Sequence, residues 1–184
     1  MSTLTLNNTK KLSIKAQTIA TMGAIFSAVA LPQIFHIMGA MSGLGTALGE
    51  TFLPMHLPII LVGLLAGPYA GAIAGFFAPL LSFMLTQMPT SAMLPFMMIE
   101  LCAYGLCAGL LCNVKLPTIA KILTVQIAGR AVRAIAIVVA VYGFNSQLPV
   151  EIIWKSIMTG VIGLALQWVL LPLLVYRIEN MNKA

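Results

Sequence analysis

Residues 53–83 read LPMHLPIILVGLLAGPYAGAIAGFFAPLLSF, an apolar stretch that opens with two prolines close together. Pro54 and Pro58 bracket His56, and almost unbroken apolar sequence follows them. Proline removes a backbone N–H donor and clashes with the preceding helical turn, so a helix in this position should be short, bent or late in starting. We therefore predict a broken helix here, with a titratable imidazole beside the break.

The whole chain shares this apolar character. Hydrophobic residues make up 60% of its 184 residues, charged residues only 8%, and the mean hydropathy is +1.03. A soluble domain would carry about a quarter charged residues. Six apolar segments can be read, most of them close to the roughly 20 residues that a spanning helix needs. They are 16–38, 51–66, 69–87, 92–112, 117–143 and 149–176.

These segments predict helices. Backbone groups in lipid must be hydrogen-bonded within the protein, and the alternating pattern of barrel strands is absent. The predicted fold is an all-α integral membrane protein, a compact bundle of six transmembrane helices that forms a single domain over residues 1–184.

Basic residues mark the ends of the predicted helices. They precede the first segment, flank the turn between the fourth and fifth, and follow the last: Lys10, Lys11, Lys15, Lys115, Lys121, Arg177 and Lys183. Cytoplasmic loops carry an excess of positive charge, so both termini and this turn should be cytoplasmic, with residues 1–12 as an N-terminal tail. Because the charges sit at membrane ends, the net charge of +6 does not indicate a nucleic-acid partner.

The cysteines and methionines predict packing rather than chemistry. Cys102, Cys107 and Cys112 are five residues apart, which rotates them off a common helix face, so neither a metal site nor a disulfide is expected. The twelve methionines are scattered along the chain and suit the filling of irregular core space.

The rare polar side chains of the apolar segments gather in the outer half of the bundle. At about 1.5 Å per residue, Glu100 lies roughly 12 Å below the outer surface, Arg133 roughly 15 Å, and Arg130 one turn deeper. The same layer contains His36, His56, Trp154 and Lys155. Such groups are costly in lipid and usually face an interior cavity. We predict a cavity in the outer half and an inner half almost without polar features.

Helical spacing groups several of these residues. Gln126, Arg130 and Arg133 follow one another at i, i+4 and i+7, and Glu100 and Tyr104 at i, i+4, so each set shares a helix face. One interpretation is a structural pair between Glu100 and either arginine. The other is substrate binding, because two arginines and a lysine face one buried glutamate and leave positive charge for a ligand.

His56 allows two interpretations as well. Its imidazole can donate and accept at the cavity wall, or it can bond carbonyls that the prolines leave free. The candidate substrate-binding residues are therefore Glu100, Tyr104, Arg130, Arg133, Gln126, His56, His36, Trp154 and Lys155.

Small residues form a ladder on the first segment, where they recur every four positions with two more beside them: Ala16, Ala20, Ala24, Ala28, Gly23 and Ser27. Such spacing lets another helix approach closely. On spacing alone, packing within the bundle and contact with an external partner are equally good interpretations. The ladder begins at the cytoplasmic end, away from the predicted cavity, which favours an external partner.

The alanine ladder, residues 31–36 (LPQIFH), residues 53–83 and residues 98–111 (MIELCAYGLCAGLL) together resemble the substrate-binding S component of energy-coupling factor (ECF) vitamin transporters. The resemblance covers nearly the whole chain, including its length, its six spans and its cytoplasmic termini. Within residues 53–83, the turn LAGPYAGAIAGF is typical of that family.

The resemblance implies a mechanism. Such a subunit resides in the bacterial cell membrane and captures a vitamin or vitamin precursor from outside with high affinity. It then docks through Ala16, Ala20 and Ala24 onto a membrane coupling subunit, EcfT, that carries two ATPase subunits, and topples to release the substrate inwards. The glycine-rich loop 39–50 would close over the site.

No cofactor is expected in this chain. It has no nucleotide motif of the form G-x-x-x-x-G-K-[ST], so ATP would be hydrolysed by partner chains. The fold itself carries little information on the substrate. Glutamate and histidine beside arginine suit a small polar heteroaromatic such as pyridoxine or hydroxymethylpyrimidine, whereas the surplus positive charge suits a carboxylate such as pantothenate. The first is the one we favour from sequence.

Two other classes of protein compete with this prediction. A membrane enzyme would need an HExxH motif, paired carboxylates or a nucleophile beside a base, and the sequence has none, so we predict no enzymatic activity. A stand-alone secondary transporter of a small polar solute would need polar groups along an inward path and tends to show inverted repeats, which are not detected. It is the alternative function.

Overall fold

The computed structural model describes residues 13–144, 146 and 148–181. Within these residues the chain forms helices and no strands. The helices are α1 (Ile14–Met41), α2 (Ala47–Phe52), α3 (His56–Ala66), α4 (Pro68–Thr86), α5 (Leu94–Leu111), α6 (Thr118–Phe144) and α7 (Glu151–Met181). With α2 and α3 counted as one span over 47–66, this part of the chain has six spans long and apolar enough to cross a membrane. The predicted all-α six-helix membrane bundle is confirmed.

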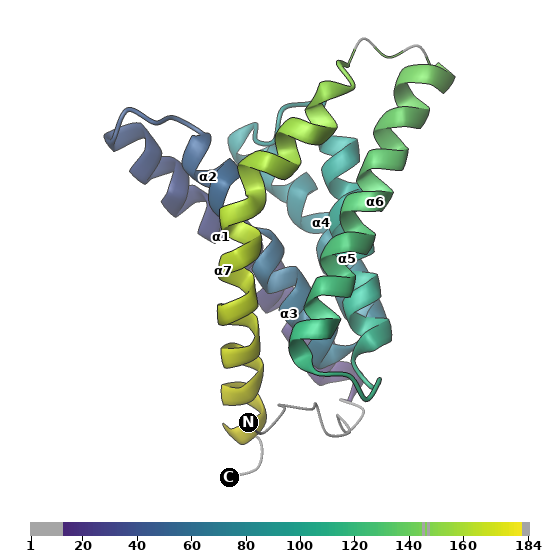
Figure 1. The fold of residues 1–184 in the computed structure, drawn as a ribbon. Coiled ribbons are helices and arrows are strands. Elements are labelled where there is room, and N and C mark those ends of the chain that lie inside the picture. The colour runs from purple at the N-terminus through teal and green to yellow at the C-terminus, as the bar shows by residue number, and fades with distance from the viewer. Residues whose placement is uncertain (1–12, 145, 147, 182–184) are drawn as a thin grey trace.

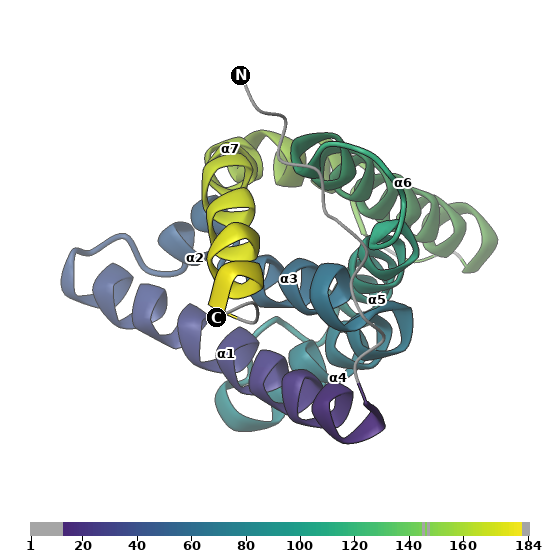
Figure 2. The ribbon, with the colours of Figure 1, turned by 90° about the horizontal axis from the view of Figure 1, so that it is seen from below.

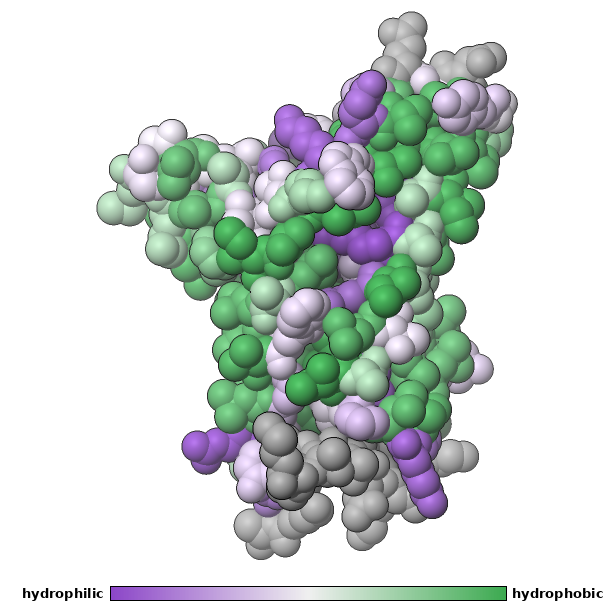
Figure 3. All heavy atoms as spheres, in the orientation of Figure 1, coloured by the Kyte–Doolittle hydropathy of each residue, from purple (hydrophilic) through white to green (hydrophobic). Residues whose placement is uncertain are grey.

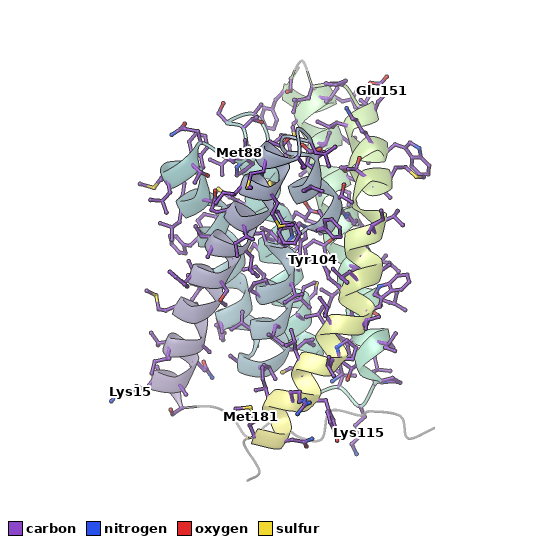
Figure 4. The ribbon with its side chains drawn as sticks, turned by 90° about the vertical axis from the view of Figure 1, so that its left-hand side faces the viewer. Lys15, Met88, Tyr104, Lys115, Glu151 and Met181 are labelled. Carbon is purple, nitrogen blue, oxygen red and sulfur yellow. The ribbon has the colours of Figure 1, made fainter. Side chains whose placement is uncertain are left out.

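The helix ends lie as the charge pattern predicted. Figure 4 places Lys15, Lys115 and Met181 at one end of the bundle, and Met88 and Glu151 at the other. The start of α1, the α5–α6 turn and the end of α7 therefore share one side, which its positive charge marks as cytoplasmic. The predictions for Lys10, Lys11, Lys183 and the tail 1–12 lie outside the described residues.

Helix α3 is at the centre of the bundle. It packs against α1, α4, α5 and α7, and the view along the bundle shows these helices around it (Figure 2). α6 packs on α5 and α7, and α2 lies against α7 near the outer end (Figure 1). The central position of α3 agrees with its burial, since eight of its eleven residues are buried.

The predicted break lies between α2 and α3. Leu53 ends α2 in the left-handed conformation, with φ 48°, and the backbone N–H of His56 donates to the Leu53 carbonyl across the turn at 3.1 Å. Pro54 occupies this turn. Pro58 falls in the first turn of α3, where a backbone N–H has no partner within the helix, so its missing donor costs little. The prolines thus place His56, 2% exposed, at the buried head of α3.

Helices α4 and α5 approach so closely that their backbones touch. A Cβ atom on Gly105 of α5 would overlap the backbone of Gly71 of α4, and a Cβ on Gly75 would overlap the backbone at Leu101. Small residues allow this distance, and the dispersion contacts of two backbones then replace those of side chains. The segment around residues 67–76 therefore fixes where α5 and its Glu100 lie.

The alanine ladder of α1 packs inside the bundle. Ala28 is fully buried and Ala24 is 8% exposed, both in the core cluster, and Ala20 packs against that cluster. Ala16, at the cytoplasmic end, is partly exposed. The small residues admit α3 and α4, so the predicted external contact is corrected for Ala24. The open face of α1 carries larger side chains, such as Met22 and Phe26.

We predict that Gly105→Ala destabilises the protein by about 1–3 kcal/mol, the usual cost of inserting a group into packed space. The added methyl group would overlap the backbone of α4, which cannot move aside as a flexible side chain could. The control is Gly23→Ala on α1, where a Cβ meets nothing within 4 Å. Alanine exceeds glycine in helix propensity by about 1 kcal/mol, so that variant should melt at or above the wild-type temperature. Equal melting temperatures for both variants in detergent would contradict the backbone contact.

Candidate functional site

A cavity of about 410 Å³ lies at the outer end of the bundle. Small-molecule sites occupy roughly 300–1,000 Å³, so this volume is large enough for a vitamin-sized compound. Its walls come mainly from α1, α2, the α2–α3 break, the α4–α5 loop, α6 and α7, with single residues from α3, α4 and α5. Its polar lining residues are His36, Thr46, Glu50, His56, Ser82, Gln87, Thr90, Arg130, Arg133, Lys155, Ser156 and Thr159.

The floor of this cavity is built on Glu100. This side chain of α5 is fully buried. Arg133 of α6 donates from Nη1 to Glu100 Oε2 at 2.8 Å, and Arg130 Nη1 lies 3.3 Å from Oε1. His56 Nε2 lies 3.8 Å from the same Oε1. One carboxylate thus faces two guanidinium groups and an imidazole, and it joins α3, α5 and α6.

The floor is charge-paired without being fully hydrogen-bonded. Among the described residues, Arg130 has no hydrogen-bond partner for Nε, Nη1 or Nη2, and neither ring nitrogen of His56 has one. Nδ1 of His36 is also without a partner in this part of the chain. Buried polar groups normally have partners, because leaving one unpaired costs free energy. These donors and acceptors can bind a polar ligand in the cavity.

Tyr104 and Gln126 lie beneath the floor and do not line the cavity. The fully buried Tyr104 ring packs edge-on against His56, with 5.1 Å between ring centroids, and its hydroxyl lies 3.5 Å from the Gln126 carbonyl. The Gln126 amide donates to Gln167 Oε1 at 3.1 Å and accepts from Trp168 Nε1 at 2.6 Å. Gln126 therefore links α6 to α7, which corrects its placement in the cavity.

This link also corrects the expectation of an inner half without polar features. Gln167, 1% exposed, forms a polar contact inside an apolar helix, and sequence analysis missed it. Lys121 is another buried polar residue, and its Nζ donates to the Cys112 carbonyl at 2.9 Å. A glutamine inside a long apolar span is the signal that could have identified Gln167, because such side chains hydrogen-bond across helices.

Trp154 is a predicted site residue that the structure places outside the cavity. It is 63% exposed and does not line the cavity, whereas Lys155 lines the mouth. Successive residues on a helix point about 100° apart, and Trp154 falls on the side of α7 that faces away from the cavity. Lys155, Ser156 and Thr159 form the inward face of α7 at this level. His36 reaches the cavity wall as predicted.

The α4–α5 loop and several methionines line the cavity, although the sequence did not assign them to it. Gln87, Met88, Pro89 and Thr90 form one wall, with further thioethers from Met55, Met93 and Met97. Part of the predicted closing loop 39–50 also lines the cavity, through Thr46, Gly49 and Glu50. The sequence analysis predicts core packing for the methionines, whereas several of them line this cavity. The Met-Pro pair between two spans is the feature of the sequence that could have indicated this wall.

A smaller hollow between α6 and α7 also reaches the arginines. Arg130, Arg133 and Ser156 line it together with apolar residues of both helices. Figure 3 shows hydrophilic surface in this area, on a face that is otherwise mostly apolar. Among the described residues, no group of three or more His, Cys, Asp or Glu side chains could hold a metal ion.

Comparison with protein families gives a match to a transporter family. The model of the family "ECF transporter, substrate-specific component" matches residues 13–176, which is most of the chain. Searches of curated proteins and of solved structures found no match.

We predict that Glu100→Gln lowers the melting temperature of the ligand-free protein. Removing the carboxylate leaves two buried guanidinium groups without their counter-charge, and breaking a buried ion pair costs about 3–5 kcal/mol. The control is Glu50→Gln at the exposed mouth. Its free energy of unfolding should stay within about 0.5 kcal/mol of the wild-type value.

A double variant tests the pair itself. Adding Arg133→Gln to Glu100→Gln removes one of the two stranded charges, so part of the lost stability should return. A Glu100→Gln protein that melts like the wild type but has lost ligand affinity would show that Glu100 serves the ligand and not the helices.

Proposed function

The chain belongs to the substrate-specific components of ECF transporters, and on that premise we propose that it is the high-affinity binding subunit of an importer for a vitamin or vitamin precursor. It would work in a bacterial cell membrane together with the coupling subunit EcfT and two ATPase subunits. The observation that carries the proposal is a cavity at the outer end whose floor is a buried cluster of charges.

Substrate would enter from outside, past Lys155 and Glu50 at the mouth. The α2–α3 break and the α4–α5 loop form the walls around it, and both are short segments that can close over a ligand more readily than a whole helix can. His56 and the arginines supply hydrogen-bond donors at the bottom. Methionine side chains, which adapt to irregular shapes, contact the apolar parts of the substrate.

Passage inward is blocked in this arrangement. Directly below Glu100 lie fully buried side chains, among them Leu101 and Tyr104, and the Gln126–Gln167 contact closes α6 on α7. A binding subunit that hands its substrate to a coupling complex suits such a floor better than a stand-alone secondary transporter, which needs a polar path on both sides. ATP would be used by the partner ATPases, and the chain itself would need no cofactor and catalyse no reaction.

The docking surface is narrower than the sequence suggested. Ala24 packs in the core, so a coupling subunit could reach only the cytoplasmic part of the ladder. Ala16 and Ala20 are partly exposed near the cytoplasmic end of α1 and remain the docking residues of this proposal.

We predict that the purified chain in liposomes binds ligand at its outer end but accumulates none. Uptake of a radiolabelled vitamin mixture should require co-reconstitution with an ECF coupling subunit, its two ATPases and ATP. The matched control contains the complex with ATP replaced by a non-hydrolysable analogue. Accumulation by the chain alone, without ATP, would refute the proposal and favour the secondary transporter.

A further inference from the structure

The interior of the cavity carries a surplus of positive charge. At its floor, Arg130 and Arg133 face the single carboxylate of Glu100, so the formal sum is +1 with His56 neutral and higher with it protonated. The chain contains only four acidic residues and no aspartate. Glu50 is exposed at the mouth, and Glu151 is exposed at the outer start of α7. Neither of these two exposed carboxylates neutralises the buried floor.

Arg130 carries the positive charge that Glu100 leaves unneutralised. Arg133 has a direct 2.8 Å hydrogen bond to Glu100, which a bound ligand need not replace. Arg130 lies 3.3 Å from the same carboxylate, and among the described residues none of its guanidinium nitrogens has a hydrogen-bond partner. Its side chain is only 10% exposed, yet it lines the cavity. Arg130 is thus a nine-tenths buried cation with unused donors that borders the ligand space.

A glycine makes room for this guanidinium. A Cβ atom on Gly160 of α7 would lie 2.8 Å from Arg130 Nη2 and 2.9 Å from Leu53 Cδ1. Any larger residue at position 160 would displace the Arg130 head group or the Leu53 side chain. Gly160 therefore allows Arg130 to lie between α6 and α7 with its donors at the cavity.

The geometry points to a small organic carboxylate as the substrate. We propose that its carboxylate binds the Arg130 guanidinium, while its apolar or aromatic body lies against the methionines of the wall. A guanidinium is a planar fork of donors that matches a carboxylate in two parallel hydrogen bonds. One negative charge brings the floor to neutrality, which an uncharged heteroaromatic cannot do. Thioethers make favourable contacts with rings as well as aliphatic chains.

This inference rests on the proposed function, because it assumes that the cavity is the substrate site. It also reverses the preference from sequence, since the structure pairs Glu100 with the arginines and leaves all three guanidinium nitrogens of Arg130 without a hydrogen bond. Lys155 and Glu50 at the mouth carry opposite charges, so selection for a negative charge falls to the deeper Arg130.

The test uses the full-length protein in detergent, with its melting temperature measured against two probes. The probes are the anionic and the non-anionic pools of a yeast-extract ultrafiltrate separated on an anion exchanger. The anionic pool should raise the melting temperature, and the non-anionic pool should not. Stabilisation by the non-anionic pool alone would overturn the inference of a carboxylate substrate while leaving the proposed function intact. Stabilisation by neither pool would refute the proposed function and the inference with it.

Variants then assign the effect to Arg130. Arg130→Gln should weaken half-maximal stabilisation by the anionic pool at least about tenfold, the effect of losing charged hydrogen bonds. Arg130→Lys keeps the positive charge but loses the forked pair of donors, and Gly160→Ala keeps the arginine but crowds its head group. Both variants should also weaken stabilisation by the anionic pool. They test the inference even if Arg130→Gln does not fold. Lys115→Gln, which removes a positive charge at the exposed α5–α6 turn, should respond like wild type. Wild-type responses from folded Arg130 variants would overturn the assignment.

Discussion

The carboxylate of Glu100 is the interaction on which the site depends. An unpaired charge at this depth in an apolar bundle would be too costly, so the chain must supply counter-charges from neighbouring helices. It does so from α6, through Arg130 and Arg133, and places His56 of α3 beside them. These contacts fix the relative rotation of three helices, and the unequal sharing of one carboxylate between two arginines leaves Arg130 with unused donors. The same contacts therefore hold the helices and prepare the ligand site.

Backbone packing determines where this cluster lies. The touching glycines of α4 and α5 set the height of Glu100, because no side chains separate the two helices at Gly71 and Gly105. On the other side of the cavity, Gly160 of α7 leaves space for the α2–α3 break as well as for Arg130. The prolines prevent α2 from continuing into α3 as one straight helix, and the space beside this break becomes the cavity. Small residues and prolines shape the cavity, and in the proposed importer its charged residues would select the substrate.

Sequence reasoning succeeded where the physics is local. Proline chemistry predicted the break beside His56, and helical rise placed Glu100 and the arginines in one layer. It failed where the answer depends on what a helix face meets. The spacing of Ala24 and Ala28 predicts the close approach of another helix but does not identify that helix. The rotation of α7 about its own axis, which turns Lys155 and not Trp154 toward the cavity, depends on the neighbouring helices. The α4–α5 loop carries no charge, so its Met88–Pro89 pair is the one signal in its sequence that could have linked it to the cavity.

The closed floor bears on how an importer of this kind releases its substrate. For a ligand to leave toward the cytoplasm, the Arg133–Glu100 bond and the Gln126 link to Gln167 and Trp168 would have to open or move together. Opening a buried ion pair alone costs about 3–5 kcal/mol, and each neutral hydrogen bond adds about 0.5–1.5 kcal/mol. A ligand that binds tightly to the closed form stabilises that form further, so binding cannot supply this energy. In the proposed importer the energy has to come from outside the chain. A rigid-body tilt driven by the coupling complex would expose the cavity while leaving these bonds intact.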